Sequence, residues 1–235
     1  MLAPIRTLLT DVFNLFYPKV CLTCDNTLHQ HEEVVCLQCE RGLPLTGHYT
    51  DADNELAKRL WGRVELQGAM GLYDFHKGAQ VQQLLHSLKY RKRQNAGTYV
   101  GQQLAAQLLQ ADCIIKNIDV IVPVPLHHKK EKQRGYNQCM PIAEAISVAM
   151  GWPVAKDALI RTVRNTSQTG MNRFERFENV KDIFAVKDAT QLQGKHVLLV
   201  DDVVTTGATS ESCIRTILSV PDTKVSFVAV GYAKG

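Results

Sequence analysis

The sequence lacks any apolar run of about 18 residues or more, so no segment has the length of a membrane-spanning helix. The stretch from Met1 to Tyr17 is apolar, but Asp11 interrupts it and no small-residue cleavage site follows, so we do not expect a secretory signal peptide. Its apolar residues between Leu8 and Phe16 recur at helical spacing and predict an amphipathic helix packed on the body of the protein. These patterns favour a soluble protein.

A strong net charge is also missing, because 27 Lys and Arg residues stand against 23 Asp and Glu residues. This balance does not by itself indicate a nucleic-acid partner. The seven cysteines are an odd number, and four of them form two short pairs near the start of the chain. Such a set is a poor disulfide framework for 235 residues, so we expect a reducing, cytoplasmic location.

Apolar runs alternate with helical patterns from Asp119 onward, which is the order of an α/β fold with a mainly parallel central sheet. Before that point, the pattern predicts a short hairpin over 63–75. The segment from Arg161 to Lys181 fits neither period and predicts a long loop. The expected helices cover residues 81–88, 96–109, 138–150 and 210–218, and the expected strands cover 120–122, 197–200 and 225–230.

The run from Val197 to Thr209 joins an apolar strand, two acids and a loop rich in hydroxyl groups. In an open α/β sheet, ligands bind beyond the carboxyl ends of the strands, where Asp201 and Asp202 are expected. Their carboxylates suit sugar hydroxyls or Mg²⁺, whose ligands are hard oxygen atoms. The loop that follows offers hydroxyls and free backbone N–H groups at the start of a helix, where the helix dipole favours a phosphate. Each part alone is also typical of a solvated turn or a helix cap, so the argument depends on their combination.

A second motif follows the apolar run at 120–122 and extends from Val122 to Gln138. Its prolines prevent a continuing helix, so this strand end is expected to present backbone amides and cations at the same sheet edge as the acids. Among the basic residues, Arg134 is the best candidate for a phosphate contact, because its planar guanidinium group matches phosphate oxygens. The neighbouring lysines are more typical of a solvated surface.

A four-cysteine motif near the start of the chain consists of two Cys-x-x-Cys pairs separated by eleven residues. Four thiolates can close a tetrahedron around Zn²⁺, and the segment around them is too poor in hydrophobic periodicity to build a core unaided. The central spacer is short, so His29 or His31 in place of one sulfur stays open, and the alternative interpretations are a redox pair and a chance spacing. The predicted zinc ligands are Cys21, Cys24, Cys36 and Cys39. The remaining cysteines are expected to be inert core residues, namely Cys113, Cys139 and Cys213.

The run from Asp201 to Thr209 resembles the phosphoribosyl-pyrophosphate (PRPP) signature of the type I phosphoribosyltransferases. This resemblance implies a parallel-sheet fold with a small hood, which we place at about 61–90, and a Mg²⁺ ion that acts with PRPP. It also implies displacement of pyrophosphate at C1 of the ribose without a nucleophilic side chain. On this basis the predicted catalytic residues are Asp201, Asp202 and Arg134. The predicted PRPP-binding residues are Val203, Val204, Thr205, Thr206, Gly207, Ala208, Thr209, Pro125 and Leu126.

Further segments extend the resemblance to the ComF family over nearly the whole chain. They are the four-cysteine knuckle, residues 85–90, 123–126 and 134–138, Glu175-Arg176 and Asn179. Within the family, the resemblance is to enterobacterial DNA-utilisation proteins, which implies an association with competence and with external DNA as a nutrient. It also implies an N-terminal helix and zinc knuckle over 1–50 and a phosphoribosyltransferase-like domain over 51–235. Tyr136 stands where the family often has Phe.

Three functions stay open at this point. The first is a phosphoribosyltransferase that releases pyrophosphate, although no motif in the hood range indicates its acceptor. The second is a binding module that kept the PRPP pocket without turnover, acting as a nucleotide sensor or as a partner of DNA-uptake proteins. The third is an accessory protein that binds single-stranded DNA through the cations of 89–93 and 129–134, with Tyr90 or Tyr136 as a stacking face.

Overall fold

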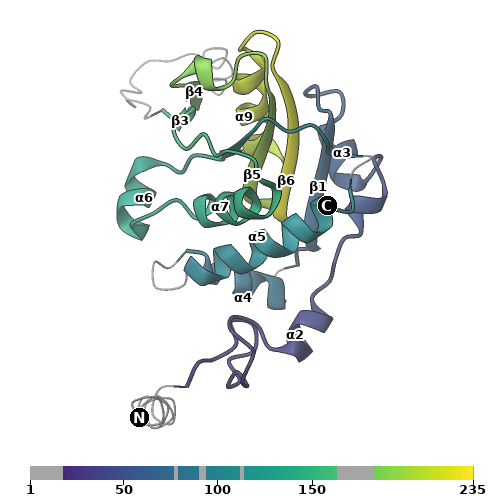
Figure 1. Ribbon diagram of the computed structural model, residues 1–235, viewed down its shortest axis with the longest axis vertical. Coiled ribbons are helices and arrows are strands. Elements are labelled where there is room, and N and C mark those ends of the chain that lie inside the picture. Colours follow the sequence, from purple (N-terminus) through teal and green to yellow (C-terminus); the bar gives the residue numbers. More distant parts are fainter. Residues whose placement is uncertain (1–17, 77–78, 90–93, 112–113, 163–182, 235) are drawn as a thin grey trace, which may run out of the picture.

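The structure of the protein, a computed structural model, describes residues 18–76, 79–89, 94–111, 114–162 and 183–234. A four-stranded sheet in the order β1-β6-β5-β2 lies at its centre, and every neighbouring pair of strands is parallel (Figure 1). The strands are β1 (Gly68–Asp74), β2 (Val120–Pro123), β5 (His196–Val204) and β6 (Lys224–Tyr232). The predicted α/β class with a central parallel sheet is therefore confirmed.

Helices cover both faces of this sheet, so its strands are buried on both sides (Figure 1). Leu198 and Val200 of β5 contribute to the core on one face, and Val197 and Leu199 contribute to the core on the other. The helices of the first face are α4 (Gln80–Ser87), α5 (Gln94–Leu108) and α7 (Cys139–Met150), and those of the second are α3 (Glu55–Leu60) and α9 (Ala208–Leu218). None of the helices in the described ranges is long and apolar enough to cross a membrane.

The segment 63–75 does not form the predicted hairpin. It carries the single strand β1, which pairs in parallel with β6. The glycines that indicated turns instead permit close packing, because a Cβ atom at Gly68 would lie 2.3 Å from the carbonyl oxygen of Ile114. A Cβ atom at Gly71 would lie 2.9 Å from Cβ of Tyr232. β1 also falls within the range assigned to the hood, and the domain boundaries stay predictions.

A short helix that the sequence did not predict, α6 (His128–Arg134), lies between β2 and α7. The prolines of this segment end at Pro125, so they do not prevent a helix that begins three residues later. The backbone N–H of Lys129 donates to Nδ1 of His127 at 3.2 Å, which caps the first turn. Gly135, with a φ of 79°, ends the helix in the left-handed region.

The remaining elements are short. They are α2 (Leu37–Gly42), the 3₁₀ helices η1 (His48–Thr50) and η3 (Ala189–Gln191), and the antiparallel pair β3 (Leu159–Arg161) and β4 (Phe184–Val186). Most of the loop predicted between Arg161 and Lys181 lies outside the described residues. The same holds for the predicted N-terminal helix and for Cys113, Tyr90, Glu175, Arg176 and Asn179.

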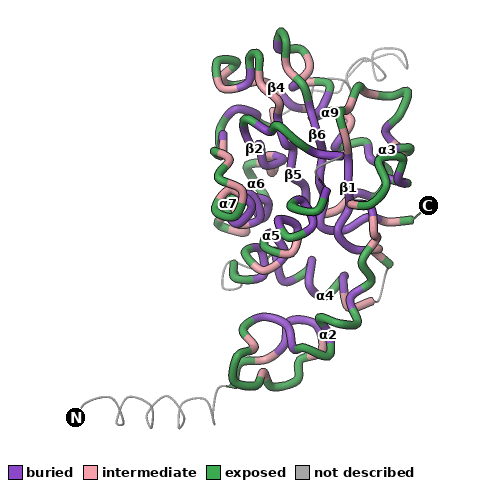
Figure 2. Tube along the Cα trace, turned by 45° about the vertical axis from the view of Figure 1, so that its right-hand side comes forward, coloured by how far each residue is buried: buried purple, intermediate pink, exposed green. Residues whose placement is uncertain are grey.

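The cysteine-rich segment forms a small body at one end of the molecule, next to α4 and α5 (Figure 2). Side chains of these two helices hold it in place. Nε2 of Gln80 in α4 donates to Sγ of Cys39 at 3.6 Å. Tyr99 and Gln103 of α5 both donate to Oε1 of Glu40, each at 3.2 Å.

Candidate functional site

Asp201 and Asp202 lie near the carboxyl end of β5 and are buried, with 5% and 9% of their surface exposed. The sequence predicted a strand that ends before them, but β6 pairs with β5 as far as Val204 and extends it. Strand β2, on the other side, pairs with β5 only as far as Val200. The acids therefore follow the point where one neighbouring strand stops, which is where ligands of open α/β sheets bind.

Two hydrogen bonds connect Asp202 with Arg134. Nε2 of Gln138 donates to Oδ2 of Asp202 at 3.1 Å, and Nη1 of Arg134 donates to Oε1 of Gln138 at 2.7 Å. Gln138 is 6% exposed, whereas Arg134 is half-buried. The sequence predicted a phosphate contact for Arg134 and no role for Gln138. The contact of Gln138 was missed because a sequence does not reveal which carboxylate a side-chain amide will bind.

The acid pair has no positively charged partner among the described residues, where no ion pair involves Asp201 or Asp202. Burial, and then the adjacent charge of Asp202, holds the pKa of Asp201 well above its usual range. Sγ of Cys139 lies 3.8 Å from Oδ1 of Asp201, and burial also raises the pKa of this thiol. The predicted core cysteine thus borders the site. The two carboxylates and the thiol place one possible ligand atom each within 4.8 Å of one another.

The loop 205–207 connects the acids to α9. Gly207 has a φ of 81°, a left-handed conformation that favours glycine. The predicted contacts Thr205, Thr206, Ala208 and Thr209 are exposed and lie at the start of an eleven-residue helix. Val203 and Val204, by contrast, pack against the core clusters.

The segment between β2 and α6 approaches the same edge of the sheet. Nδ2 of Asn137 donates to the carbonyl oxygen of Val124 at 2.9 Å, and its Oδ1 accepts from the N–H of Cys139 at 3.0 Å. Asn137 thereby fixes the start of α7 to the end of β2. Pro125 and Leu126 are half-buried and line an open cavity of 540 Å³ between α6, α7 and β3.

Two arginines near α3 also contact the loop, and sequence analysis did not select them. Nη1 of Arg59 donates to the carbonyl oxygen of Thr205, and Nη1 of Arg63 lies 3.4 Å from that of Thr206. No motif relates these arginines to a loop that follows so much later in the chain. They meet the loop because β1, which follows α3, pairs with β6 beside β5.

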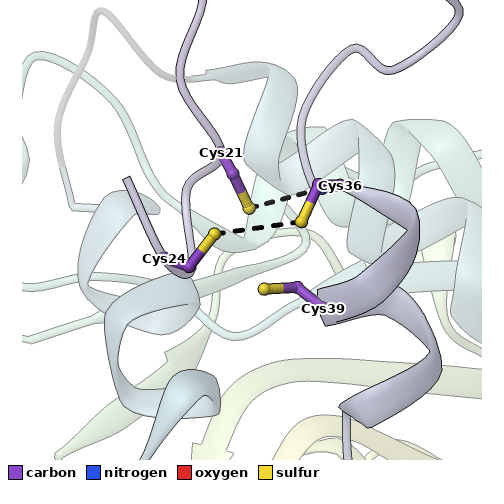
Figure 3. A group of neighbouring side chains, drawn as sticks. All are labelled: Cys21, Cys24, Cys36 and Cys39. Carbon is purple, nitrogen blue, oxygen red and sulfur yellow. Dashed lines mark hydrogen bonds between the residues drawn. The ribbon is translucent and has the colours of Figure 1, made fainter. Parts of the chain in front are cut away.

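The four cysteines of the N-terminal motif point toward one another (Figure 3). Their Sγ atoms all lie within 4.8 Å of one another, and those of Cys24 and Cys36 are 3.8 Å apart. A tetrahedral zinc ion with bonds of about 2.3 Å places its sulfur ligands about 3.8 Å apart, so this cluster fits zinc. His29 and His31 are exposed, and the cluster contains neither of them.

Hydrogen bonds to sulfur support a thiolate at Cys21. Its Sγ lies 3.3 Å from both Oγ1 of Thr23 and the backbone N of Cys36. Burial raises the pKa of Cys21, but these hydrogen bonds outweigh it and lower the pKa to about 6. Burial, followed by the neighbouring thiols, raises the pKa of Cys39. The six described cysteines are all free.

Fold and site together define a class: a parallel-sheet α/β protein with a buried acid pair and a helix-terminal loop at its carboxyl edge, joined to a four-cysteine knuckle. No protein-family model matches the chain. The DNA utilization protein YhgH of Escherichia coli K12 is 27% identical to it over 202 residues, which cover 85% of this chain and 84% of that protein. Competence protein F of Haemophilus influenzae is 24% identical over 83% of this chain and 88% of the relative. Competence protein ComFC of Bacillus subtilis is 26% identical over 85% of this chain and 78% of the relative. The recognition of the ComF family from the sequence is thereby confirmed.

Solved structures are more distant. The glutamine PRPP amidotransferase of Bacillus subtilis, complexed with ADP and GMP, matches with a TM-score of 0.41 and 20% identity over 61% of this chain. The match covers only 26% of the amidotransferase chain. Adenine phosphoribosyltransferase of Saccharomyces cerevisiae matches with a TM-score of 0.33 and 15% identity, covering 67% of this chain and 70% of that one.

Proposed function

We propose that the protein binds PRPP at the carboxyl edge of its sheet and transfers the phosphoribosyl group to an acceptor. The observation that carries this proposal is the adjacency of the buried acid pair and the exposed loop: two residues of β5 separate Asp202 from Thr205. Carboxylates suit the ribose hydroxyls, and the N–H groups at the start of α9 suit a phosphate. A ribose phosphate therefore matches the spacing of both groups.

Magnesium fits the acid pair better than a softer metal does. Asp201 and Asp202 would supply hard oxygen ligands, and the repulsion between two buried carboxylates would be relieved by a divalent cation. Cys139 is not a ligand that Mg²⁺ prefers. When bound, the ion would neutralise charge on the pyrophosphate group.

The chain's own residues would orient the reactants. The bond between C1 of the ribose and the pyrophosphate oxygen breaks, a bond from C1 to the acceptor forms, and the acceptor loses a proton. Arg134 is the predicted cation for the departing pyrophosphate, and its bond to Gln138 would also keep Asp202 in place. Pro125 and Leu126 would line the pyrophosphate side of the site. No nucleophilic side chain is needed.

We also propose that Cys21, Cys24, Cys36 and Cys39 hold a structural zinc ion. Their mutual spacing and the N–H donated to Cys21 support this assignment. The names of the relatives support a role in competence or in the use of external DNA, which we place in the cytoplasm.

Calorimetry with PRPP tests the proposal. We expect binding that requires Mg²⁺ and that falls at least about tenfold in the Asp201→Asn, Asp202→Asn double variant, because an amide keeps the shape of the carboxylate but loses its charge. The matched control is Asp222→Asn, which makes the same change at an exposed aspartate in the loop before β6. Parental affinity in the double variant would refute the assignment.

Turnover is tested by measuring pyrophosphate release with panels of purines, pyrimidines and amines. Release with one class identifies the acceptor. No release from any panel, together with salt-sensitive binding of single-stranded DNA that is indifferent to PRPP, would replace the enzyme with a binding module.

A further inference from the structure

Helix α3 is anchored so that its polar side lies against the loop between β5 and α9. Oδ1 of Asn54 accepts from the N–H groups of Leu56 and Ala57, at 3.1 and 3.0 Å, and caps the helix. Leu56, Ala57 and Leu60 are buried in the core of this sheet face. Leu60 also approaches Gly207, where a Cβ atom would lie 3.4 Å from its Cδ2. The helix therefore holds a fixed position beside the loop.

Arg59 is held by three groups at once. Its Nη1 donates to the carbonyl oxygen of Thr205 and, at 2.7 Å, to that of Ala233. Its guanidinium carbon lies 4.4 Å from the centroid of the Tyr232 ring. A planar group that stacks and donates in its plane is fixed in orientation. Among the described residues, no carboxylate forms an ion pair with Arg59.

Arg63 contacts the next carbonyl of the loop. Its Nη1 lies 3.4 Å from the carbonyl oxygen of Thr206 and 3.8 Å from Oε2 of Glu211 in α9. Arg215 of α9 donates in turn to the carbonyl oxygen of Arg63. Two successive loop carbonyls thus face arginines that are themselves held by neighbouring groups.

Because the peptide bond is planar, the positions of the two loop carbonyls also fix the direction of the N–H groups that follow them. In a trans peptide, C=O and N–H point in opposite directions. When the carbonyls of Thr205 and Thr206 face the arginines, the N–H groups of Thr206 and Gly207 point away from them. Within the described ranges, neither of these N–H groups donates a hydrogen bond to another residue. Both are therefore available to an anion.

We propose that Arg59 and Arg63 are positioning residues for phosphate binding: they fix the two loop carbonyls so that the N–H groups of Thr206 and Gly207 face the ligand. This inference rests on the proposed function, because it assigns a phosphate to this loop. The arginines act through the loop and do not touch the phosphate.

NMR relaxation without ligand tests the fixed position of this loop independently of PRPP. In Arg59→Ala, we expect the backbone order parameters of 206–208 to fall below about 0.6, while those in the interior of α9 stay near about 0.85. Lys58→Ala, an exposed change on the same helix, is the matched control and should behave like the parent. Arg59→Lys, which keeps the charge but not the planar fork, should lie between the two and is also the variant to use if Arg59→Ala does not fold.

Calorimetry then measures the affinity of each variant for PRPP with Mg²⁺ and for ribose 5-phosphate. Arg59→Ala and Arg63→Ala should weaken both ligands about tenfold, whereas Lys58→Ala should not. Parental order parameters at 206–208 in Arg59→Ala would overturn the inference, as would an equal fall throughout α9, which would indicate that Arg59 only stabilises the fold in general. A parent protein that binds neither ligand would instead refute the proposed function, while the order parameters still decide whether Arg59 fixes the loop.

Discussion

Replacing Gln138 by leucine tests whether its amide holds the acid pair. Gln138 is 6% exposed and donates to Asp202 at 3.1 Å. Leucine has a similar volume, so the change removes the hydrogen bond without opening a large cavity. A hydrogen bond to a charged group contributes about 1.5–3 kcal/mol. We discount the bond from Arg134, because that side chain is half-buried and regains water.

The expected loss is therefore about 2 kcal/mol in the free energy of unfolding. For a chain of this length, each 1 kcal/mol lowers Tm by about 2–4 °C, so thermal unfolding should show a decrease of about 4–8 °C. Gln103→Leu is a matched control, because Gln103 donates to the exposed carboxylate of Glu40. This substitution should lower the free energy of unfolding much less.

A double-mutant cycle with Asp202→Asn separates the energy of the hydrogen bond between Gln138 and Asp202 from the packing contribution of the Gln138 side chain. If the amide acts on the carboxylate, Gln138→Leu should cost less than about 1 kcal/mol in the Asp202→Asn background, since a neutral partner leaves a weaker bond. Equal losses in both backgrounds, additive within about 0.5 kcal/mol, would refute the reasoning.

Three further predictions follow from other parts of the structure. Metal analysis should find one zinc ion per chain, and Cys36→Ser should release it and expose the knuckle to protease; a metal-free parent with equal protease resistance would contradict this. Arg134→Ala should lower the turnover of PRPP more than its affinity, because a cation at the leaving group matters most as negative charge grows there; an effect on affinity alone would make Arg134 a ground-state anchor. Burial lowers the pKa of His48, whose Nδ1 accepts from the N–H of Gly71 at 3.1 Å. Its neutral form is the stabilising one, so unfolding free energy should be lost as the pH falls below about 6.5 and through the lowered pKa. His48→Gln should flatten this pH dependence.

Elements that depend on local periodicity could be predicted from the sequence. The helix expected over 138–150 is α7, Cys139–Met150, because its apolar residues recur within the element itself. β1 was missed because its pairing partner, β6, lies at the far end of the described chain. A glycine that permits close packing, such as Gly68, looks the same in a sequence as a glycine in a turn.

The candidate site divides in the same way. The acid pair and the loop could be predicted together because they are adjacent in the sequence, on one strand and the turn after it. The two cysteine pairs of the knuckle could be predicted for the same reason, because their ligands are close in sequence. Gln138 and Arg59 could not, because their roles depend on which acid and which carbonyl the fold brings beside them. Sequence spacing carries no information on such contacts until the pairing of the strands is known.

The central place of β6 in the sheet has a consequence for how the chain folds. β6 lies between β1 and β5, although β1 and β5 are both synthesised before it. During synthesis, the edge of β1 that pairs with β6 has no partner until residues 224–232 have been made. The long interval favours exposure of an unpaired edge of an apolar strand, a state that is open to non-native pairing. The four-cysteine knuckle, whose ligands are close in sequence, is free to form much earlier than the sheet on which it rests.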